Sequence, residues 1–292
     1  MARRKLLKTY TVRFYAARTE QPDGEKPYRI HELFRELSRA ASQAGGLCPP
    51  TSDGALTYEI RDLRALNSAG VVMGVFAVLR DDAPHIRGGD RTERPILLGE
   101  DEGLIEKNHF LFYAQTGLLV YQVNQRANHP MRLEQYLTDL AGLNRAVVFG
   151  DILTRDAWKK LSQGIVKRLE VTIDVPKNRM AYDPDDFTGP TLQTMEQAGA
   201  RKALITLSAG RGAAMTTWIR DQLLRMKGGP HIDRLQVKLD GEEHPLDLLA
   251  NTVRDRIEVV MDGRYPDTSE TFTQLAAAYD RQREALRAHF GQ

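Results

Sequence analysis

The sequence has one cysteine, no long hydrophobic run and almost no excess of either charge. Cys48 cannot form an internal disulfide, and no second thiol is present to complete a metal-binding pair. No apolar stretch approaches the roughly 18 residues that a transmembrane helix needs. With 41 basic and 39 acidic residues, the chain is not a polycation, so binding to an anionic partner must depend on local patches.

Catalytic and metal-binding motifs are also missing. None of the seven histidines forms a pair at the i, i+4 spacing with which a helix presents two zinc ligands. The serines lack the strand-turn-helix setting of a nucleophile elbow. We therefore predict no catalytic residue, no metal site and no cofactor, and we expect a binding protein rather than an enzyme.

The densest apolar stretch is residues 103–137. Aromatic and branched side chains fill 108–113 and 118–122, and between them Gly117 can take the positive φ of a hairpin connection. Because both arms are apolar at nearly every position, we expect a β-hairpin inside a sheet that is covered on both faces. Within it, His109 is expected to be a hydrogen-bonded core residue rather than a ligand.

The segments before this hairpin show strand and helix patterns. A period-2 pattern over residues 8–17 predicts a strand with one buried face, and its interrupting charges do not fit a signal peptide. Apolar residues at helical spacing over 30–41 predict a helix, which should end at the following Gly-Gly pair. Residues 56–60 and 71–79 predict two further strands.

The character of the sequence changes near Gly150. Thr154 is placed to cap a helix, and residues 169–175 alternate as a strand. The elements expected next are helix 191–199, strand 202–208, helix 213–227 and strand 232–239. This succession of strand, helix, strand, helix, strand is that of a ferredoxin-like or split βαβ unit. Residues 246–261 fit both a helix and a strand.

These elements predict an α+β fold with a larger mixed sheet and a smaller, inserted ferredoxin-like (split βαβ) domain. Residues 1–150 and 240–292 would form the larger domain, and residues 151–239 the smaller one. The last helix, 267–290, carries a regular apolar stripe. We expect it either to dock on the larger domain or to pair with a second copy in a homodimer.

Basic residues gather in the smaller predicted domain. On one side of a small α/β domain they would suit the phosphate backbone of nucleic acid. The alternative is a solvated surface of mixed charge, because acids such as Asp221 lie in the same segment. No helix-turn-helix or base-stacking signature is present, so binding would be largely independent of base sequence. The candidate DNA-binding residues are Lys159, Lys160, Lys167, Arg168, Arg211, Arg220, Arg225 and Lys227.

A second hypothesis is a metal-dependent enzyme acting on DNA or on a phosphate-bearing substrate. The turn from Ser208 to Gly212 joins a predicted strand to a predicted helix, where free N–H groups and Arg211 would meet a phosphate. It lacks the Lys-Ser/Thr of a P-loop, and its glycines also suit the turn alone. Acidic clusters at 100–102 and 183–186 would supply metal ligands, but neither has EF-hand spacing and the second fits a turn.

Several segments form an ordered pattern across nearly the whole chain. They are YTVRFYAAR with the helix IHELFRELSRAA, KNHFLFYAQTGLLVYQVN with the helix RLEQYLTDL, then VVFGDIL, RLEVTIDVPK and AAAYDRQREALRAHF. In this order the sequence resembles the RexA family of phage exclusion proteins.

The resemblance implies a homodimer that binds double-stranded DNA without strong sequence preference, in phage exclusion or another antiviral defence function. Each protomer would have a larger α+β domain and a smaller, mobile α/β domain, with no catalytic motif. We expect a cytoplasmic location, no membrane span, and a second protein of the same defence system as a further partner. A third hypothesis is an interaction protein whose C-terminal helix and apolar hairpin form the partner surface.

Overall fold

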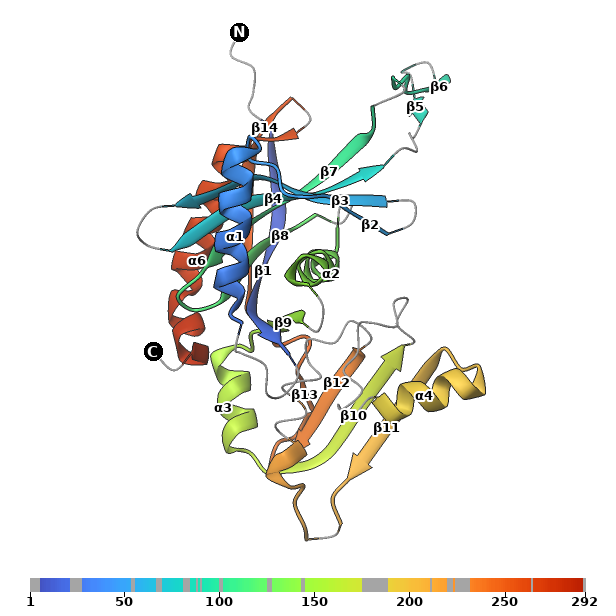
Figure 1. Ribbon diagram of the computed structural model, residues 1–292. Helices are drawn as coiled ribbons and strands as arrows, with labels where there is room; N and C mark the ends of the chain where they lie inside the picture. The colour runs from blue at the N-terminus through green and yellow to red at the C-terminus, as the bar shows by residue number, and fades with distance from the viewer. Residues whose placement is uncertain are drawn as a thin grey trace. The chain divides into compact units, whose positions relative to one another are not determined.

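The computed structural model (Figure 1) describes most of the chain. The described residues are 6–21, 28–53, 56–66, 70–80, 85–87, 89, 91–99, 102–124, 128–142, 145–174, 189–210, 212–219, 223, 232–263 and 265–290. They form an α+β fold, as predicted, with a large sheet, a smaller sheet and helices packed on them.

Two compact units divide the chain. Unit 1 contains Met1–Arg13, Ala17–Val147 and Asp255–Asp280, and unit 2 contains Phe14–Ala16, Val148–Arg254 and Arg281–Gln292. The predicted smaller domain, 151–239, lies within unit 2. Unit 2 also takes in the chain up to Arg254 and the last residues of the C-terminal helix.

The larger sheet is built from antiparallel hairpins. Its strands are β1 (Leu7–Glu20), β2 (Thr51–Asp53), β3 (Leu56–Leu66), β4 (Val71–Arg80), β7 (Leu104–Tyr113), β8 (Leu118–Val123), β14 (Arg254–Asp262) and β15 (Tyr265–Pro266). They lie in the order β15-β14-β1-β8-β7-β4-β3-β2, and β9 (Ala146–Asp151) also pairs with β1. A separate short hairpin, β5 (His85–Arg87) with β6 (Glu93–Pro95), occurs in the polar connection before β7.

The β7–β8 hairpin lies in the interior of this sheet, between β4 and β1. Residues 108–112 and 118–122 are all buried, as expected for a sheet covered on both faces. Gly117 has a φ of +69°, and a Cβ there would lie only 2.8 Å from the carbonyl oxygen of Ala17. The Ala17 N–H donates back to the Gly117 carbonyl at 2.7 Å. The hairpin and its glycine are therefore confirmed.

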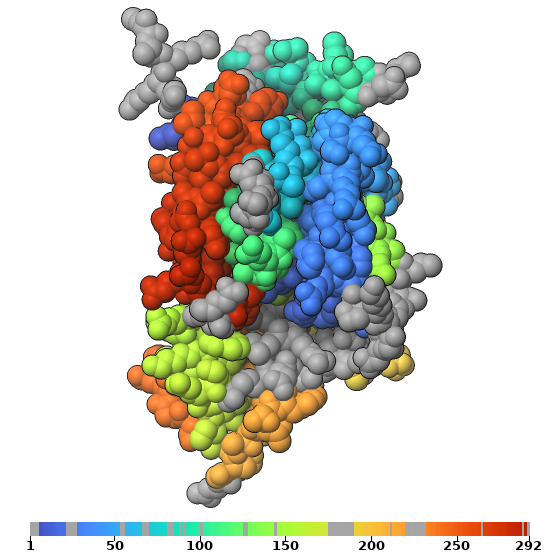
Figure 2. All heavy atoms as spheres, turned by 60° about the vertical axis from the view of Figure 1, so that its left-hand side comes forward, coloured from blue at the N-terminus to red at the C-terminus, as the bar shows by residue number. Residues whose placement is uncertain are grey.

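Helices cover the two faces of the sheet. They are α1 (Ile30–Gln43), α2 (Pro130–Ala141) and α6 (Thr268–Phe290). Phe34 of α1 stacks on Phe112, with ring centroids 4.2 Å apart, and Tyr279 of α6 stacks on Tyr113 at the same separation. Because successive strand residues project to opposite faces, α1 and α6 lie on opposite sides. Figure 2 shows sheet side chains (cyan and green) between α6 (red) and α1 (blue).

The helix ends follow the local signals in the sequence. After α1, Gly45 and Gly46 have φ values of +65° and +91°, and the Gly46 N–H donates to the Ala41 carbonyl at 2.7 Å. At the start of α6, the Asp267 Oδ1 accepts the Glu270 N–H at 2.7 Å. The C-terminal helix docks on the sheet of its own chain, the first of the two arrangements expected for it.

The smaller sheet belongs to unit 2. Its elements are α3 (Arg155–Gln163), β10 (Val166–Asp174), α4 (Gly189–Ala198), β11 (Lys202–Ser208), β12 (Ile232–Leu239) and β13 (Leu246–Asp247). The strand order is β11-β10-β12-β13, and β10 is antiparallel to both neighbours. Because β11 and β12 therefore run parallel on either side of β10, this is a split βαβ arrangement. Inward side chains of β10 and β12, together with Leu161 of α3, form its core.

Two sequence expectations need adjustment. Residues 246–261 do not form a helix: β13 and β14 occupy the two ends of the segment. The helix predicted over 213–227 begins later, since the first described helical residues are 217–219. Residues 220–222 and 224–227 of that predicted helix lie outside the described residues.

The close pairing of β4 with β7 gives a stability prediction. Gly74 lies directly opposite Phe110, and a Cβ at Gly74 would lie 2.6 Å from a carbon of the Phe110 ring. We expect Gly74→Ala to lower the free energy of unfolding by about 1–3 kcal/mol, because the buried ring must shift in a packed core. Urea denaturation measures this difference. Gly89→Ala, where a Cβ meets nothing within 4 Å, is the control. Equal stability of the two variants would contradict the prediction.

A buried polar cluster joins the hairpin to α6. His109 is 1% exposed, and its Nδ1 donates to the Gln122 Oε1 at 2.7 Å. The other ring nitrogen, Nε2, lies 3.4 Å from the hydroxyl of Thr268. Burial lowers the pKa of His109, against the opposing effect of the Gln122 hydrogen bond. His109 is thus a hydrogen-bonded core residue, as predicted.

The lowered pKa of His109 predicts acid sensitivity. The unfolded chain takes up a proton near the ordinary histidine pKa of about 6.5, whereas the folded state does so only at lower pH. This contribution to stability is present above pH 6.5 and is lost as the pH falls below it. His109→Gln should reduce the pH dependence of the free energy of unfolding, which urea denaturation at several pH values measures. The part due to His129, whose pKa is also lowered by burial, should remain. If the pH dependence of this variant equals that of the wild-type chain, His109 is not a source of the acid sensitivity.

Candidate nucleic-acid interface

The described candidate residues lie on two consecutive elements of unit 2. Lys159 and Lys160 are exposed on α3, and Lys167 and Arg168 are the second and third residues of β10. The other four candidates, Arg211, Arg220, Arg225 and Lys227, lie outside the described residues.

The short α3–β10 connection positions Lys160 against the end of β12. Thr154 caps α3 by accepting the Ala157 N–H at 3.4 Å, as its sequence predicts. Gly164 follows the helix and donates its N–H to the Lys160 carbonyl at 2.8 Å. A Cβ on Gly164 would lie 2.5 Å from that carbonyl and 2.9 Å from Leu239 at the end of β12. Only glycine allows the helix and the strand to approach so closely.

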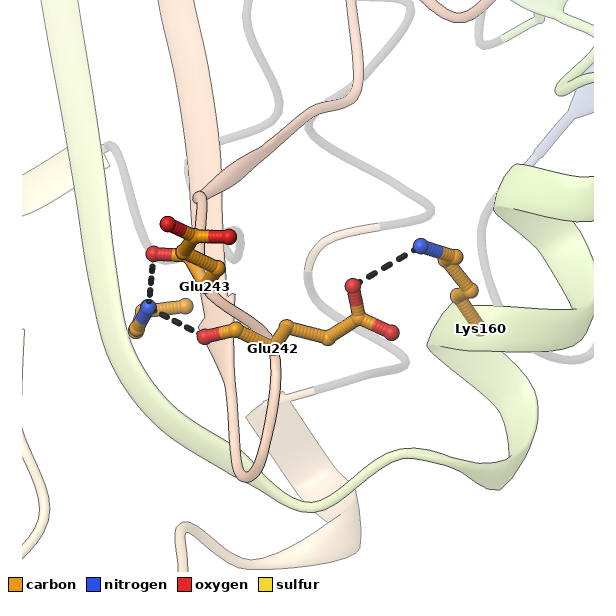
Figure 3. Close-up of polar contacts among 4 residues, drawn as sticks. Lys160, Glu242 and Glu243 are labelled. Carbon is orange, nitrogen blue, oxygen red and sulfur yellow. Dashed lines mark hydrogen bonds and ion pairs between the residues drawn. The ribbon is translucent and has the colours of Figure 1, made fainter.

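Two lysines contact the turn after β12. The Lys160 Nζ lies 2.8 Å from a carboxylate oxygen of Glu242 (Figure 3). The Lys238 Nζ donates to the backbone carbonyls of Glu242 and Glu243, the latter at 2.6 Å. The turn itself contains Gly241, which has the positive φ of +74° that a tight connection requires.

Two further cations lie next to this turn. The Lys167 Nζ donates to the Ala213 carbonyl at 2.8 Å and lies 3.7 Å from a carboxylate oxygen of Asp240. Arg168 is the direct cross-strand partner of Lys238, and its guanidinium lies 2.7 Å from Glu170. We call Lys160, Lys167, Arg168 and Lys238 the basic cluster.

The basic cluster contains one residue that sequence reasoning missed. Lys238 is distant in sequence from Lys160 and Lys167, and only the β10–β12 register brings it beside Arg168. A signal was available, since Lys238 is the second-last residue of the predicted strand 232–239. Its position relative to the other cations could not be read from that signal.

The open face of the same sheet carries a network of paired charges. Lys202 lies 2.5 Å from Asp233 and 3.5 Å from Asp174. Its hydrogen bond with Asp233 raises the pKa of Lys202 and lowers that of Asp233. Glu170 lies between Arg168 and Arg234, at 3.7 Å from the latter. This part of the surface fits the mixed-charge alternative.

Some backbone groups in and next to the Ser208 to Gly212 turn form hydrogen bonds within the protein. The Ala209 N–H donates to the Lys167 carbonyl at 2.8 Å, and the Ala213 N–H donates to the Gly210 carbonyl at 2.9 Å. The described helical residues begin only at 217, several residues after the strand ends. The turn is therefore not a direct strand-to-helix connection of the kind that presents helix N–H groups to a phosphate.

The metal sites considered from sequence are only partly covered by the structure. Among the described residues, no three histidine, cysteine or acidic side chains come together in a way that would hold a metal ion. The cluster at 183–186 and two residues of the cluster at 100–102 lie outside the described residues. The described helices include none that is long and apolar enough to cross a membrane.

The comparison with protein families covers both units. Residues 67–285 match the model of a family described as a family of unknown function (DUF6731). The chain belongs to this family. The match includes the β7–β8 hairpin, all four residues of the basic cluster and most of α6. No curated protein matches the chain.

The ion pairs of the basic cluster should contribute little to stability. The side chains of Lys160 and Glu242 are 48% and 39% exposed. Solvent screening limits such a pair to about 0.2–1 kcal/mol. A double-mutant cycle of Lys160→Ala and Glu242→Ala, followed by urea unfolding, measures the coupling directly. A coupling free energy above about 2 kcal/mol would contradict the expectation that this exposed pair is weak.

Proposed function

We propose that this DUF6731 protein binds double-stranded DNA without strong sequence preference, through the basic cluster of unit 2. The observation that carries the proposal is the meeting of Lys160, Lys167, Arg168 and Lys238 around one turn. Phosphate binding requires several cations within reach of one backbone, and three of these four were expected from sequence.

The acidic partners of Lys160 and Lys167 do not prevent phosphate binding. Glu242 and Asp240 are 39% and 58% exposed, so their pairs with lysine are screened by water. A DNA phosphate can replace such a carboxylate at little cost in free energy, and the release of counterions from DNA then favours the complex. The carboxylates would act as competing anions that weaken, rather than abolish, binding.

Sequence independence follows from the kind of contact. Lysine binds a phosphate as a point charge, and phosphate contacts carry no direct base information. The open face of the unit 2 sheet offers no aromatic side chain on its described strands for stacking with bases. We therefore favour duplex DNA, contacted through its phosphate backbone, as the nucleic acid that is bound.

The biological setting that we propose comes from the ordered resemblance to the RexA family. It is phage exclusion or another antiviral defence, carried out by a homodimer in the cytoplasm. A second protein of the same defence system would be a further partner. In this setting, binding without sequence preference lets the protein act on DNA of any origin.

The proposal is tested by the salt dependence of binding to a random DNA duplex. We expect the triple variant Lys160→Gln, Lys167→Gln, Arg168→Gln to bind more weakly. The slope of log K against log salt should fall by up to about 0.9 for each lost phosphate contact. In the opposite direction, Asp240→Asn with Glu242→Gln should tighten binding several-fold, because two competing anions are removed. Fluorescence anisotropy over a salt series measures both effects.

The matched control removes three exposed cations from unit 1. These are Arg35 and Arg39 of α1 and Lys107 of β7, each replaced by Gln. This variant has the same net charge as the triple variant, so it separates a local contact from a general loss of charge. The proposal fails if the wild-type chain does not bind at low salt, or if the two triple variants bind equally.

A further inference from the structure

The sheet of unit 2 has two unequal edges. It ends in β13, with two residues, on one side and in β11, with seven residues, on the other (Figure 1). The end strands of the larger sheet are also short, with three residues in β2 and two in β15. Proteins commonly protect edge strands from pairing by short length, prolines, charges or bulges.

Strand β11 has little of this protection. Its sequence, KALITLS, contains no proline and no charge after Lys202. Its ladder with β10 runs without a bulge from Lys202 to Ser208. Among the described strands that end the two larger sheets, β11 is the long and regular one.

The backbone of β11 presents hydrogen-bonding groups at this edge. The Ala209 N–H donates to the Lys167 carbonyl of β10. In a regular antiparallel ladder, this places the N–H and C=O groups of the odd-numbered residues of β11 toward β10. The groups of the even-numbered residues, from 202 to 208, therefore point away from β10. No described strand pairs with that side.

The side chains of β11 show that the edge is incompletely covered. Ala203, Ile205 and Leu207 pack against the core of unit 2 but stay only half-buried. The inward side chains of the neighbouring β10 are fully buried. On the opposite face, Leu204 is 65% exposed. A strand added beside β11 would cover apolar area on both faces.

We propose that β11 pairs with β11 of a second copy of this chain, antiparallel and centred on Ile205. The inference rests on the homodimer of the proposed function, and it names the interface. In this register the outward groups of residues 202, 204, 206 and 208 meet those of residues 208, 206, 204 and 202 of the other copy. This pairing forms about eight backbone hydrogen bonds, the most that any two-fold register of this strand allows.

The side chains of β11 are complementary to themselves in this register. Ala203 lies opposite Leu207 of the second copy, so a small residue meets a large one, and the two Ile205 side chains meet at the axis. Lys202 lies opposite Ser208, so no like charges face each other directly. The two-fold axis is perpendicular to the sheet, which places Arg168 of both copies on the same open face.

The first test blocks the edge without disturbing the monomer. The Thr206 N–H points away from β10, so Thr206→Pro removes an edge donor but no bond within the sheet. We expect the full-length wild-type chain to sediment as a dimer and Thr206→Pro as a monomer, while Thr206→Val stays dimeric. Sedimentation velocity without DNA measures these states. A wild-type chain that is monomeric up to about 100 µM, or a dimeric Thr206→Pro, would overturn the inference.

A charge exchange controls for misfolding. The two Leu204 side chains are diagonal neighbours across the axis, so Leu204→Lys or Leu204→Glu alone should give monomers by repulsion. An equal mixture of the two variants should restore a one-to-one heterodimer. The inference is wrong if the variants dimerise alone, or if the mixture stays monomeric.

Cross-linking tests the register. Ile205 meets its own copy at a position without hydrogen bonds, where Cα atoms are about 4.5 Å apart, which is within the disulfide range. Ile205→Cys should form a covalent dimer on oxidation, and Thr206→Cys should not. The native Cys48 is buried and should give little background. Equal cross-linking by both variants would exclude this register. If the chain dimerises through β11 but does not bind DNA, the proposed DNA binding fails and this interface stands. If the chain binds DNA and dimerises but Thr206→Pro stays dimeric, only this interface fails.

Discussion

Burial of the β7–β8 hairpin on both faces is the constraint on which unit 1 depends. Residues 108–112 and 118–122 leave no polar face for water, so helices must cover the sheet on both sides. The stacking of Phe34 on one face and Tyr279 on the other meets this need. Burial of the polar side chain of His109 would cost free energy if its ring nitrogens had no hydrogen-bond partners. Gln122 and Thr268 supply these partners.

In unit 2 the corresponding constraint is the register between β10 and β12. It places Arg168 beside Lys238 and brings the turn after β12 next to Lys160 and Lys167. The four cations therefore surround a turn that also carries acids, which keeps the site close to neutral when no partner is present. Because these acids are exposed, their pairs with the cations are weak and exchangeable. A site of this kind suits reversible, salt-sensitive binding.

The two proposals use different parts of the same sheet. Phosphate contact would occur at the end where β10 begins and β12 ends, whereas pairing of two copies would occur along the free side of β11. A dimer formed there would present two basic clusters on one continuous sheet, and a longer stretch of duplex would then contact more cations. The match to the DUF6731 family, over residues 67–285, includes both the basic cluster and β11.

Local patterns in the sequence determined the elements. Alternation gave strands 202–208 and 232–239, Thr154 and Asp267 marked helix starts, and Gly117 marked the hairpin turn, because each depends on neighbouring residues alone. The tertiary structure decided which distant residues meet. Lys238 joined the basic cluster, residues 246–261 became turn and strand, and β11 became an edge through long-range pairing. Periodicity reports which face of a strand is buried, but carries no information on which strand lies beside it.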